Sequence, residues 1–275
     1  LIQLPGEAHY PITTRFLKAP IRSYPSTMAG LILSINQKEP TDILAFITSS
    51  SEAVKMCRQV TSDDPKTYCV ELYSGMDPEK KAIAQSVDAY KALGDYHQKV
   101  VMATNVAESS ITIDGLDCVI DSCHEIYSAY KPEYMANVIG KRLITKAQAI
   151  QRRGRVGRTS PGTCFHLLTQ EQFDKLQNYP EPDIRSRDIT QDLLRFVEIS
   201  PGRSFDSAKE LLNQLMDPPS KVYLKTAERL FRSTGLIDQD GSYTEKGIQI
   251  VKMANVSLDH ALLLWEAFQR GVVHE

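Results

Sequence analysis

The sequence predicts an α/β protein, in which a parallel sheet with flanking helices comes first and a mostly helical region follows. Short apolar runs recur through roughly the first 170 residues, and stretches with the apolar spacing of helices separate them. Strands that alternate with helices in this way build βαβ units, whose sheets are parallel. Beyond Leu168 the apolar runs give way to successive helical patterns.

The predicted strands are the short apolar runs. Leu1–Leu17 alternates loosely around the turn signal Pro5-Gly6 and indicates one or two strands. The later runs are almost continuously apolar, which suits parallel strands that are buried on both faces. They cover Asp42–Thr48, Tyr68–Tyr73, Lys99–Thr104, Cys118–Asp121 and Thr163–Leu168.

Helices are predicted between these strands. Tyr24–Asn36 has the apolar spacing of a helix, and Ser49–Glu52 opens another behind a serine cap. Asp77–Leu93 forms a third, with Pro78 in its first turn, where proline is tolerated.

The second half begins with Gln170–Arg187, a polar connector that contains two prolines. Helical patterns follow, and Asp240-Gly241 marks a hairpin between the last two of them. The predicted helices are Ile189–Val197, Phe205–Leu215, Lys221–Thr234 and Leu258–Arg270. Helices followed by a short hairpin suggest a winged-helix module.

Composition narrows the class of protein. The formal net charge is −2, so no global basic field indicates nucleic acid, and any such site must be a local groove. No apolar run approaches membrane-spanning length, so we expect no membrane partner. The five cysteines are scattered without zinc spacing, which predicts reduced thiols in a reducing compartment, the cytoplasm or the nucleus.

The Arg/Gly-rich stretch Thr145–Arg158, TKAQAIQRRGRVGR, opens with the spacing of a capping box and is predicted to be helical. On such a helix Gln151, Arg155 and Arg158 fall on one face, and the two glycines fall opposite, where a neighbour can approach closely. Arginines held together suit bidentate contact with phosphate oxygens. The alternative is a solvated basic helix end.

A polar loop, Ala103–Gly115, follows the third buried strand with the sequence ATNVAESSITIDG. It can hold phosphate oxygens through Thr104, Asn105 and backbone N–H groups, and a ribose through Asp114. The alternative is that these residues form an ordinary polar βα loop with a capped helix and have no binding function. Ligands of parallel sheets bind beyond the carboxyl ends of the strands, so we expect Ser49–Ser51, residues 105–114 and Gln151 at that edge.

Together these two stretches carry a family resemblance. ATNVAESSITIDG, followed about thirty residues later by QRRGRVGRTSPG, resembles motifs V and VI of the DEAH/RHA family of superfamily 2 helicases. DILAFITSSSE resembles the motif IV region and LYSGMDP the LYSxLP segment. By this resemblance 1–170 is the second RecA-like domain, 171–254 a connector and winged-helix domain, and 255–275 the first helix of a truncated ratchet domain.

The resemblance implies roles for named residues. Arg155 and Arg158 match arginine fingers that reach the ATP γ-phosphate, and Gln151 matches a glutamine that places this phosphate or the attacking water. The matches on the nucleotide side are Ser109, Thr112 and Asp114. The matches to residues that touch the nucleic-acid backbone are Thr48, Thr104 and Asn105.

The chain also departs from the family pattern. Arg153 replaces the usual alanine of motif VI, and Ser49–Glu52 replaces the usual GQEE after motif IV. Gln85 stands where many members carry an adenine-stacking phenylalanine. Cys123–Ile144 stands where the family has a strand-separating β-hairpin; three tyrosines, Tyr127, Tyr130 and Tyr134, either line it or simply pack.

The sequence contains no GxxxxGK[ST] phosphate loop and no DEAH-type acidic motif. We therefore expect half of an ATPase site. ATP or another NTP with Mg²⁺ is the expected cofactor, and most ligands come from a first RecA-like domain. The chain alone should hydrolyse negligible ATP.

Single-stranded RNA is the expected substrate, with DNA as the alternative, and the resemblance leaves open whether an activator protein is a further partner. No metal site is predicted, because His97, His124 and His166 lack partners at ligand spacing. The rival function is a non-catalytic nucleic-acid-binding scaffold with degenerate helicase motifs. A dehydrogenase-like domain lacks its GxGxxG fingerprint.

Overall fold

The computed structural model describes residues 10–108, 111–253 and 256–272. The chain divides into two compact units. The first comprises Leu1–Tyr127 and Gly140–Pro180, and the second comprises Ser128–Ile139 and Glu181–Glu275. The predicted three-part division at residues 170 and 254 stays a prediction.

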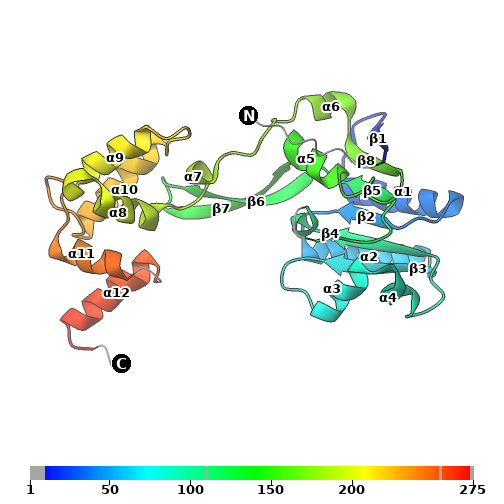
Figure 1. The fold of residues 1–275 in the computed structure, drawn as a ribbon, viewed down its shortest axis with the longest axis horizontal. Coiled ribbons are helices and arrows are strands. Elements are labelled where there is room, and N and C mark those ends of the chain that lie inside the picture. Colours follow the sequence, from blue (N-terminus) through cyan, green and yellow to red (C-terminus); the bar gives the residue numbers. More distant parts are fainter. Residues whose placement is uncertain (1–9, 109–110, 254–255, 273–275) are drawn as a thin grey trace. The chain divides into compact units, whose positions relative to one another are not determined.

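A six-stranded parallel sheet forms the centre of the first unit (Figure 1), as the alternation of strands and helices predicted. The strand order is β1-β8-β5-β2-β4-β3. The strands are β1 Ile12–Leu17, β2 Ile43–Phe46, β3 Thr67–Leu72, β4 Gln98–Ala103, β5 Cys118–Asp121 and β8 Gly162–Thr169. All residues of β2, β4 and β5 are buried, which explains why these runs are almost continuously apolar.

The two faces of the sheet have separate apolar cores. Ile43 and Ala45 of β2 pack in one core with residues of α1 (Tyr24–Lys38) and α2 (Ser50–Asp63). Leu44 and Phe46 point to the other face, because successive side chains of a strand alternate. There they pack against the segment that follows β4, through its residues Ala107, Ile111, Ile113 and Leu116.

The predicted helix Asp77–Leu93 is wrong as a single element. The structure has two helices, α3 (Pro78–Gln85) and α4 (Val87–Lys91), with Ser86 between them in an extended conformation. The Ser86 hydroxyl accepts a hydrogen bond from the Ala89 N–H at 3.2 Å, so the serine caps α4 and restarts the helix.

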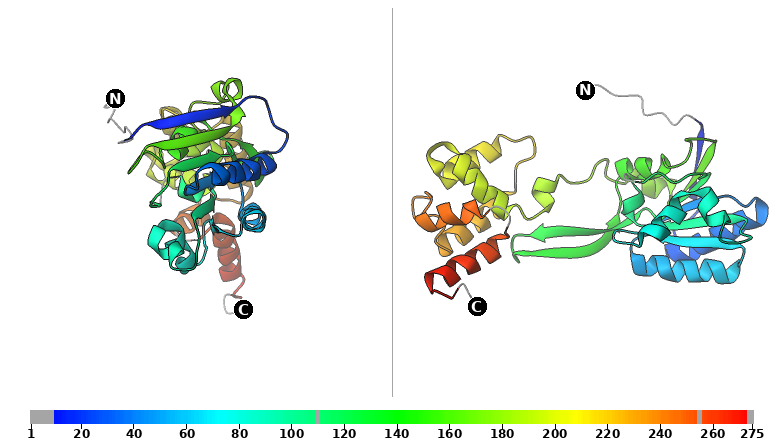
Figure 2. Two further views of the ribbon diagram at one scale, coloured as in Figure 1. Left: turned by 90° about the vertical axis from the view of Figure 1, so that its right-hand side faces the viewer. Right: turned by 60° about the horizontal axis from the view of Figure 1, so that its bottom comes forward.

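Two strands form a separate hairpin, which confirms the hairpin expected at Cys123–Ile144. β6 (His124–Lys131) pairs with β7 (Ala136–Leu143) in a two-stranded sheet, seen as a long ribbon in Figure 2. Of its three tyrosines, Tyr127 packs under the Arg142 guanidinium and Tyr130 packs edge-on against Tyr223. Tyr134 is 75% exposed, so two of the three have a packing role.

The second unit is mainly helical and has its own apolar core. Its helices are α7 Asp183–Ser186, α8 Thr190–Ile199, α9 Phe205–Asn213, α10 Lys221–Ser233, α11 Glu245–Lys252 and α12 Leu258–Gln269. Gly235, at φ +70°, ends α10, and an antiparallel bridge between Ile237 and Tyr243 follows it around the predicted Asp240-Gly241 turn. The assignment of this unit as a winged helix stays a prediction. Short segments complete the chain: η1 Asn105–Ala107, η2 Pro201–Arg203 and α6 Gln170–Asp174.

The cysteine prediction is wrong for one pair. Cys57 of α2 and Cys69 of β3 form a disulfide, because the fold brings residues twelve positions apart together. Cys118, Cys123 and Cys164 are free and buried. Among the described residues, no helix has both the length and the apolarity that a membrane crossing requires.

Candidate nucleotide and nucleic-acid site

A pocket of about 330 Å³ opens at the carboxyl ends of β2, β3 and β4. Thr48, Thr104 and Asn105 all line it, so the fold brings together the three residues matched to nucleic-acid contacts. The remaining lining residues are Ile47, Ser49, Ser50, Tyr73, Ser74, Glu125, Ile126 and Arg152. Hydroxyl and amide groups dominate its polar wall, which suits phosphate and ribose oxygens.

Thr48 is held by the start of α2. Its N–H and its hydroxyl both donate to the Glu52 carboxylate, at 3.0 and 2.8 Å. The Ser49 hydroxyl accepts from the Glu52 N–H at 3.3 Å, which confirms the serine cap. Tyr24 also donates to Glu52. Glu52 therefore fixes the Thr48 backbone and side chain at the rim of the pocket, in the segment where the family pattern is altered.

Thr104 and Asn105 are placed by the end of β4. The Thr104 N–H donates to the Leu72 carbonyl at 3.0 Å, which extends the pairing of β4 with β3 by one step. Asn105 then begins the short 3₁₀ helix η1 and is exposed. Both side chains thus stand just beyond the strand ends, where ligands of parallel sheets bind.

The loop that follows leaves this edge. It crosses the sheet face with Ala107, Ile111 and Ile113 buried. The Asp114 N–H then donates to the Gln85 carbonyl at 2.9 Å, and Gln85 Nε2 donates to the Thr112 carbonyl at 3.2 Å.

The placement of the whole segment 105–114 at the carboxyl edge is therefore wrong. A Cβ at Gly115 would lie 3.6 Å from Asp42, the residue that precedes β2, so Asp114 is close to the amino edge. Because β4 and β5 are parallel, the chain must return from the carboxyl edge of the sheet to its amino edge before β5 can start. Thr112 and Asp114 are exposed beside Gln85, and Ser109 lies outside the described residues.

The helix predicted at Thr145–Arg158 is also too long. The capping box is present, since the Thr145 hydroxyl and the Gln148 side chain each bond the other's backbone, but α5 covers only Lys146–Arg153. Gly154 ends it, and Gly157 turns the chain at φ +75°. A Cβ at Gly157 would lie 2.6 Å from Ile12, so the glycine allows β1 to approach.

Arg155 and Arg158 consequently lie beyond the helix, and only Gln151 is on it. The Arg155 guanidinium donates to the carbonyls of Glu108 and of Ile111, the latter at 3.1 Å. Arg158 is exposed, and its Nε donates to the Gly154 carbonyl at 3.3 Å. Burial and, to a smaller extent, the positive charge of Arg158 lower the pKa of Arg155.

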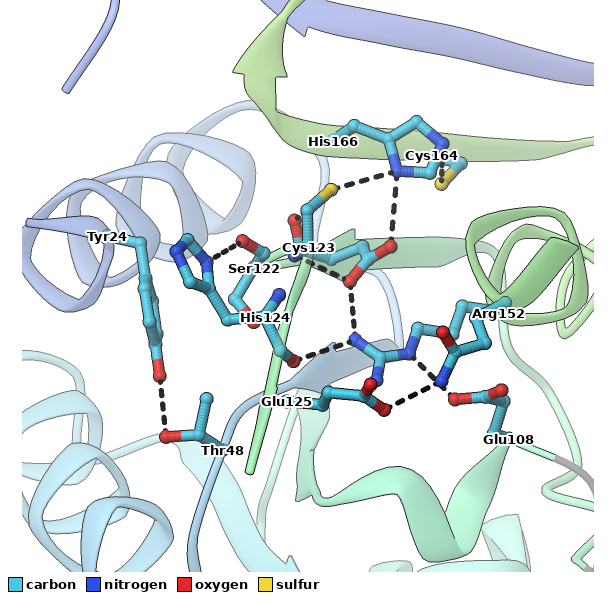
Figure 3. A network of polar contacts seen from close by, with 12 residues as sticks. Tyr24, Thr48, Glu108, Ser122, Cys123, His124, Glu125, Arg152, Cys164 and His166 are labelled. Carbon is cyan, nitrogen blue, oxygen red and sulfur yellow. Dashed lines mark hydrogen bonds and ion pairs between the residues drawn. The ribbon is translucent and has the colours of Figure 1, made fainter. Parts of the chain in front are cut away.

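A buried ion-pair network under this site was missed by the sequence reasoning. Arg152 is fully buried, and its Nε donates to Glu108 at 3.1 Å while Nη1 donates to Asp121 at 2.9 Å (Figure 3). Nη1 also donates to the His124 carbonyl at 3.2 Å. The partners stand 28 to 44 residues away, so no local pattern could have revealed them.

The pKa values of the two carboxylates shift in opposite directions, although burial by itself raises both. Burial raises the pKa of Glu108, and the Arg152 charge only partly offsets it. For Asp121, burial alone would raise the pKa, but Arg152 and the hydrogen bond from His166 outweigh it and hold the pKa at about 2. Asp121 is therefore ionised at neutral pH and balances the Arg152 charge.

Two of the three histidines have acidic partners far away in the sequence, which their spacing along the chain did not indicate. His97 Nε2 lies 3.1 Å from Asp64, and His166 Nδ1 lies 3.2 Å from Asp121 and 3.5 Å from Cys123 Sγ. Asp121, Cys123 and His166 offer donor atoms within 4.8 Å of one another, the only such group among the described residues. However, the Arg152 cation already bonds Asp121, and burial raises the pKa of the Cys123 thiol well above its ordinary value. The group is better explained as a hydrogen-bonded core than as a metal site.

Comparisons with known proteins find similarity to helicases. Residues 25–160 match the model of the helicase conserved C-terminal domain. The whole chain is 45% identical over 276 aligned positions to an Acanthamoeba polyphaga mimivirus protein named "Putative ATP-dependent RNA helicase L540", of which it spans 40%.

Two solved structures share the fold. The Escherichia coli DExH-box NTPase HrpB matches with a TM-score of 0.79 and 23% identity over 93% of this chain and 30% of that one. A structure described as the E. coli DEAH/RHA helicase HrpB matches with a TM-score of 0.77 and 24% identity over 94% and 32%.

Proposed function

We propose that this chain, whose residues 25–160 match the helicase conserved C-terminal domain, is the C-terminal part of an ATP-dependent helicase that moves along single-stranded RNA. One observation carries the proposal. The loop after β4 begins with Thr104 and Asn105 at a hydroxyl-lined pocket, and the carbonyls of its residues Glu108 and Ile111 accept hydrogen bonds from Arg155. One loop would therefore contact both the nucleic acid and the nucleotide, and a translocating ATPase needs such a connection between its two sites.

The nucleotide would bind against the arginines. Arg158 is exposed and carries a fixed positive charge, so it suits the stabilisation of charge on a γ-phosphate in phosphoryl transfer. Arg155 would join it through the guanidinium N–H groups that are not bonded to the Glu108 and Ile111 carbonyls, and Gln151 would orient the phosphate or the attacking water. Thr112 and Asp114, beside Gln85, would contact the ribose, and the motif V resemblance assigns Ser109 to nucleotide binding as well.

The rest of the nucleotide site would come from another part of the natural polypeptide. This sequence has no phosphate loop and no acidic motif for Mg²⁺. The chain spans 40% of the length of its mimivirus relative, so the activity of the intact polypeptide is a proposal. The residues present fit the arginine half of a shared ATP site.

The RNA backbone would lie in the strand-end pocket. Thr48, Thr104 and Asn105 can contact phosphate and ribose groups, which gives grip without reading the base sequence. The name of the mimivirus relative supports RNA over DNA. Alternating closure and opening of the ATP site would then move the strand.

The test is ATP hydrolysis by the intact natural polypeptide, with and without single-stranded RNA and with single-stranded DNA of equal length. We expect RNA to stimulate hydrolysis and Arg158→Ala to reduce kcat by about 10³-fold, as loss of an arginine finger does. RNA affinity should stay within twofold. Arg270→Ala removes another exposed arginine, the C-cap of α12, and should leave both quantities unchanged.

A folded intact protein that binds RNA but hydrolyses no ATP would overturn the catalytic proposal. The scaffold function would then be the better assignment. Stronger stimulation by DNA than by RNA would reject RNA as the substrate while leaving the motor intact.

A further inference from the structure

Arg152 joins three separate segments of the first unit. It sits in the last turn of α5 with its side chain fully buried. Its guanidinium reaches Glu108 in the loop after β4, Asp121 at the end of β5 and the His124 carbonyl at the start of β6. It also lies 4.8 Å above the Phe46 ring of β2. A planar fork with fixed donor directions is suited to holding several acceptors in one geometry.

Glu108 connects this network to the site. Its carboxylate accepts from Arg152, and its backbone carbonyl accepts from Arg155. The two arginines are three positions apart, and the turn after α5 lies between them. Glu108 is thus held at both ends, and any displacement of its side chain would shift the carbonyl that orients Arg155.

The charges in the network make Arg152 hard to replace. The side chains of Asp121 and Glu108 are 0% and 11% exposed, and both carboxylates accept hydrogen bonds from the Arg152 guanidinium. A lysine would keep the charge but lacks the fork, so it could bond only one carboxylate in the observed geometry. The network therefore depends on the guanidinium shape as well as on its charge.

We propose that Arg152 is a positioning residue for NTP hydrolysis: through Glu108 it fixes the loop carbonyls that orient Arg155. This inference rests on the proposed ATPase function and goes beyond it, because Arg152 itself does not touch the nucleotide. The strand-end pocket should be little affected, since Thr104 and Asn105 are placed by the end of β4.

The decisive variants are Glu108→Leu and Glu108→Gln in the intact polypeptide. Leucine keeps the side-chain bulk but removes the acceptor for Arg152, whereas glutamine keeps an acceptor oxygen. We expect Glu108→Leu to lower kcat at saturating RNA at least tenfold, with the RNA Kd within twofold. Glu108→Gln should stay within threefold of the wild-type kcat. Glu71→Leu, which removes another ion-paired carboxylate of low exposure, is the matched control and should change neither quantity.

Two further measurements separate positioning from simple destabilisation. Hydrogen exchange should rise in residues 104–115 of Glu108→Leu and stay unchanged in β2 and β4. If Glu108→Leu does not fold, Glu108→Ala replaces it, because alanine also removes the acceptor for Arg152, and we expect the same loss of kcat, about tenfold, with RNA affinity retained.

The outcomes are distinct. A Glu108→Leu variant that keeps kcat within threefold would overturn the inference. Equal losses of kcat and RNA affinity would also overturn it, because they indicate a plain structural role. Absence of hydrolysis in the wild-type protein would instead reject the proposed function, and this inference would fall with it.

Discussion

The strand-end pocket and the arginine segment, residues 154–158, are built in different ways. In the pocket, Thr104 directly follows the last residue of β4, and Thr48 stands two residues after the end of β2. In the arginine segment, Arg155 is oriented by Ile111, 44 residues away, and the Gly157 carbonyl accepts from the Tyr10 N–H at 3.1 Å. The pocket is thus a local result of strand direction, whereas the arginines depend on distant parts of the chain. Substitutions should therefore act locally in the pocket and globally in the arginine segment.

Gly157→Ala should have the largest effect on stability. The residue has φ +75°, and its new Cβ would lie 2.6 Å from Ile12 and 3.0 Å from the Tyr10 carbonyl. We expect a loss of about 3 kcal/mol, from left-handed backbone strain plus overpacking. Denaturant unfolding measures it. Gly75→Ala, at φ +82° with nothing within 4 Å, isolates the strain and should lose only about 1–2 kcal/mol. Equal losses in the two variants would mean that the close approach of β1 is unimportant.

Acid should weaken the network beneath the arginine segment. Asp121 has its pKa lowered from 3.8 to about 2 by Arg152 and His166, which outweigh burial. A lowered pKa gives stability that is present above the unfolded value and is lost as pH falls through the folded value. We expect Asp121 to contribute about 2 kcal/mol of pH-dependent stability between pH 4 and pH 2.

Unfolding free energies across that range, compared between the wild type and Asp121→Asn, measure the contribution. The variant should be less stable at neutral pH and should lose less on acidification. Parallel pH curves for the two proteins would contradict the assignment of this titration to Asp121.

Thr104→Val should have the smallest and most local effect. It removes one hydroxyl from the strand-end pocket and keeps the side-chain shape. We expect RNA affinity to fall by about 1 kcal/mol, roughly fivefold, with the Tm unchanged. Thr112→Val, on the same loop but beside Gln85, should leave RNA affinity unaltered. A similar loss of affinity in both variants would show that the two ends of the loop are not functionally separate.

The same contrast explains which predictions from the sequence succeeded. Strands such as Cys118–Asp121 were predicted with correct bounds, because a strand buried on both faces must be a continuous apolar run. A serine cap among Ser49–Ser51 and the capping box at Thr145 were also predicted, since such caps depend on residues three positions apart, and Ser49 is the cap in the structure. By contrast, Ser86 breaks a helix whose apolar spacing continues across it.

The sequence by itself determined the α/β order, the parallel sheet, the polar residues that follow the strands and the resemblance to helicases. Local periodicity and short motifs specify these features, because they depend on neighbouring residues. Only the tertiary structure decided the end of α5, the partners of Arg152 and the course of the loop from Thr104 to Asp114. These depend on contacts between residues far apart in the chain, and burial gives such contacts their energetic weight.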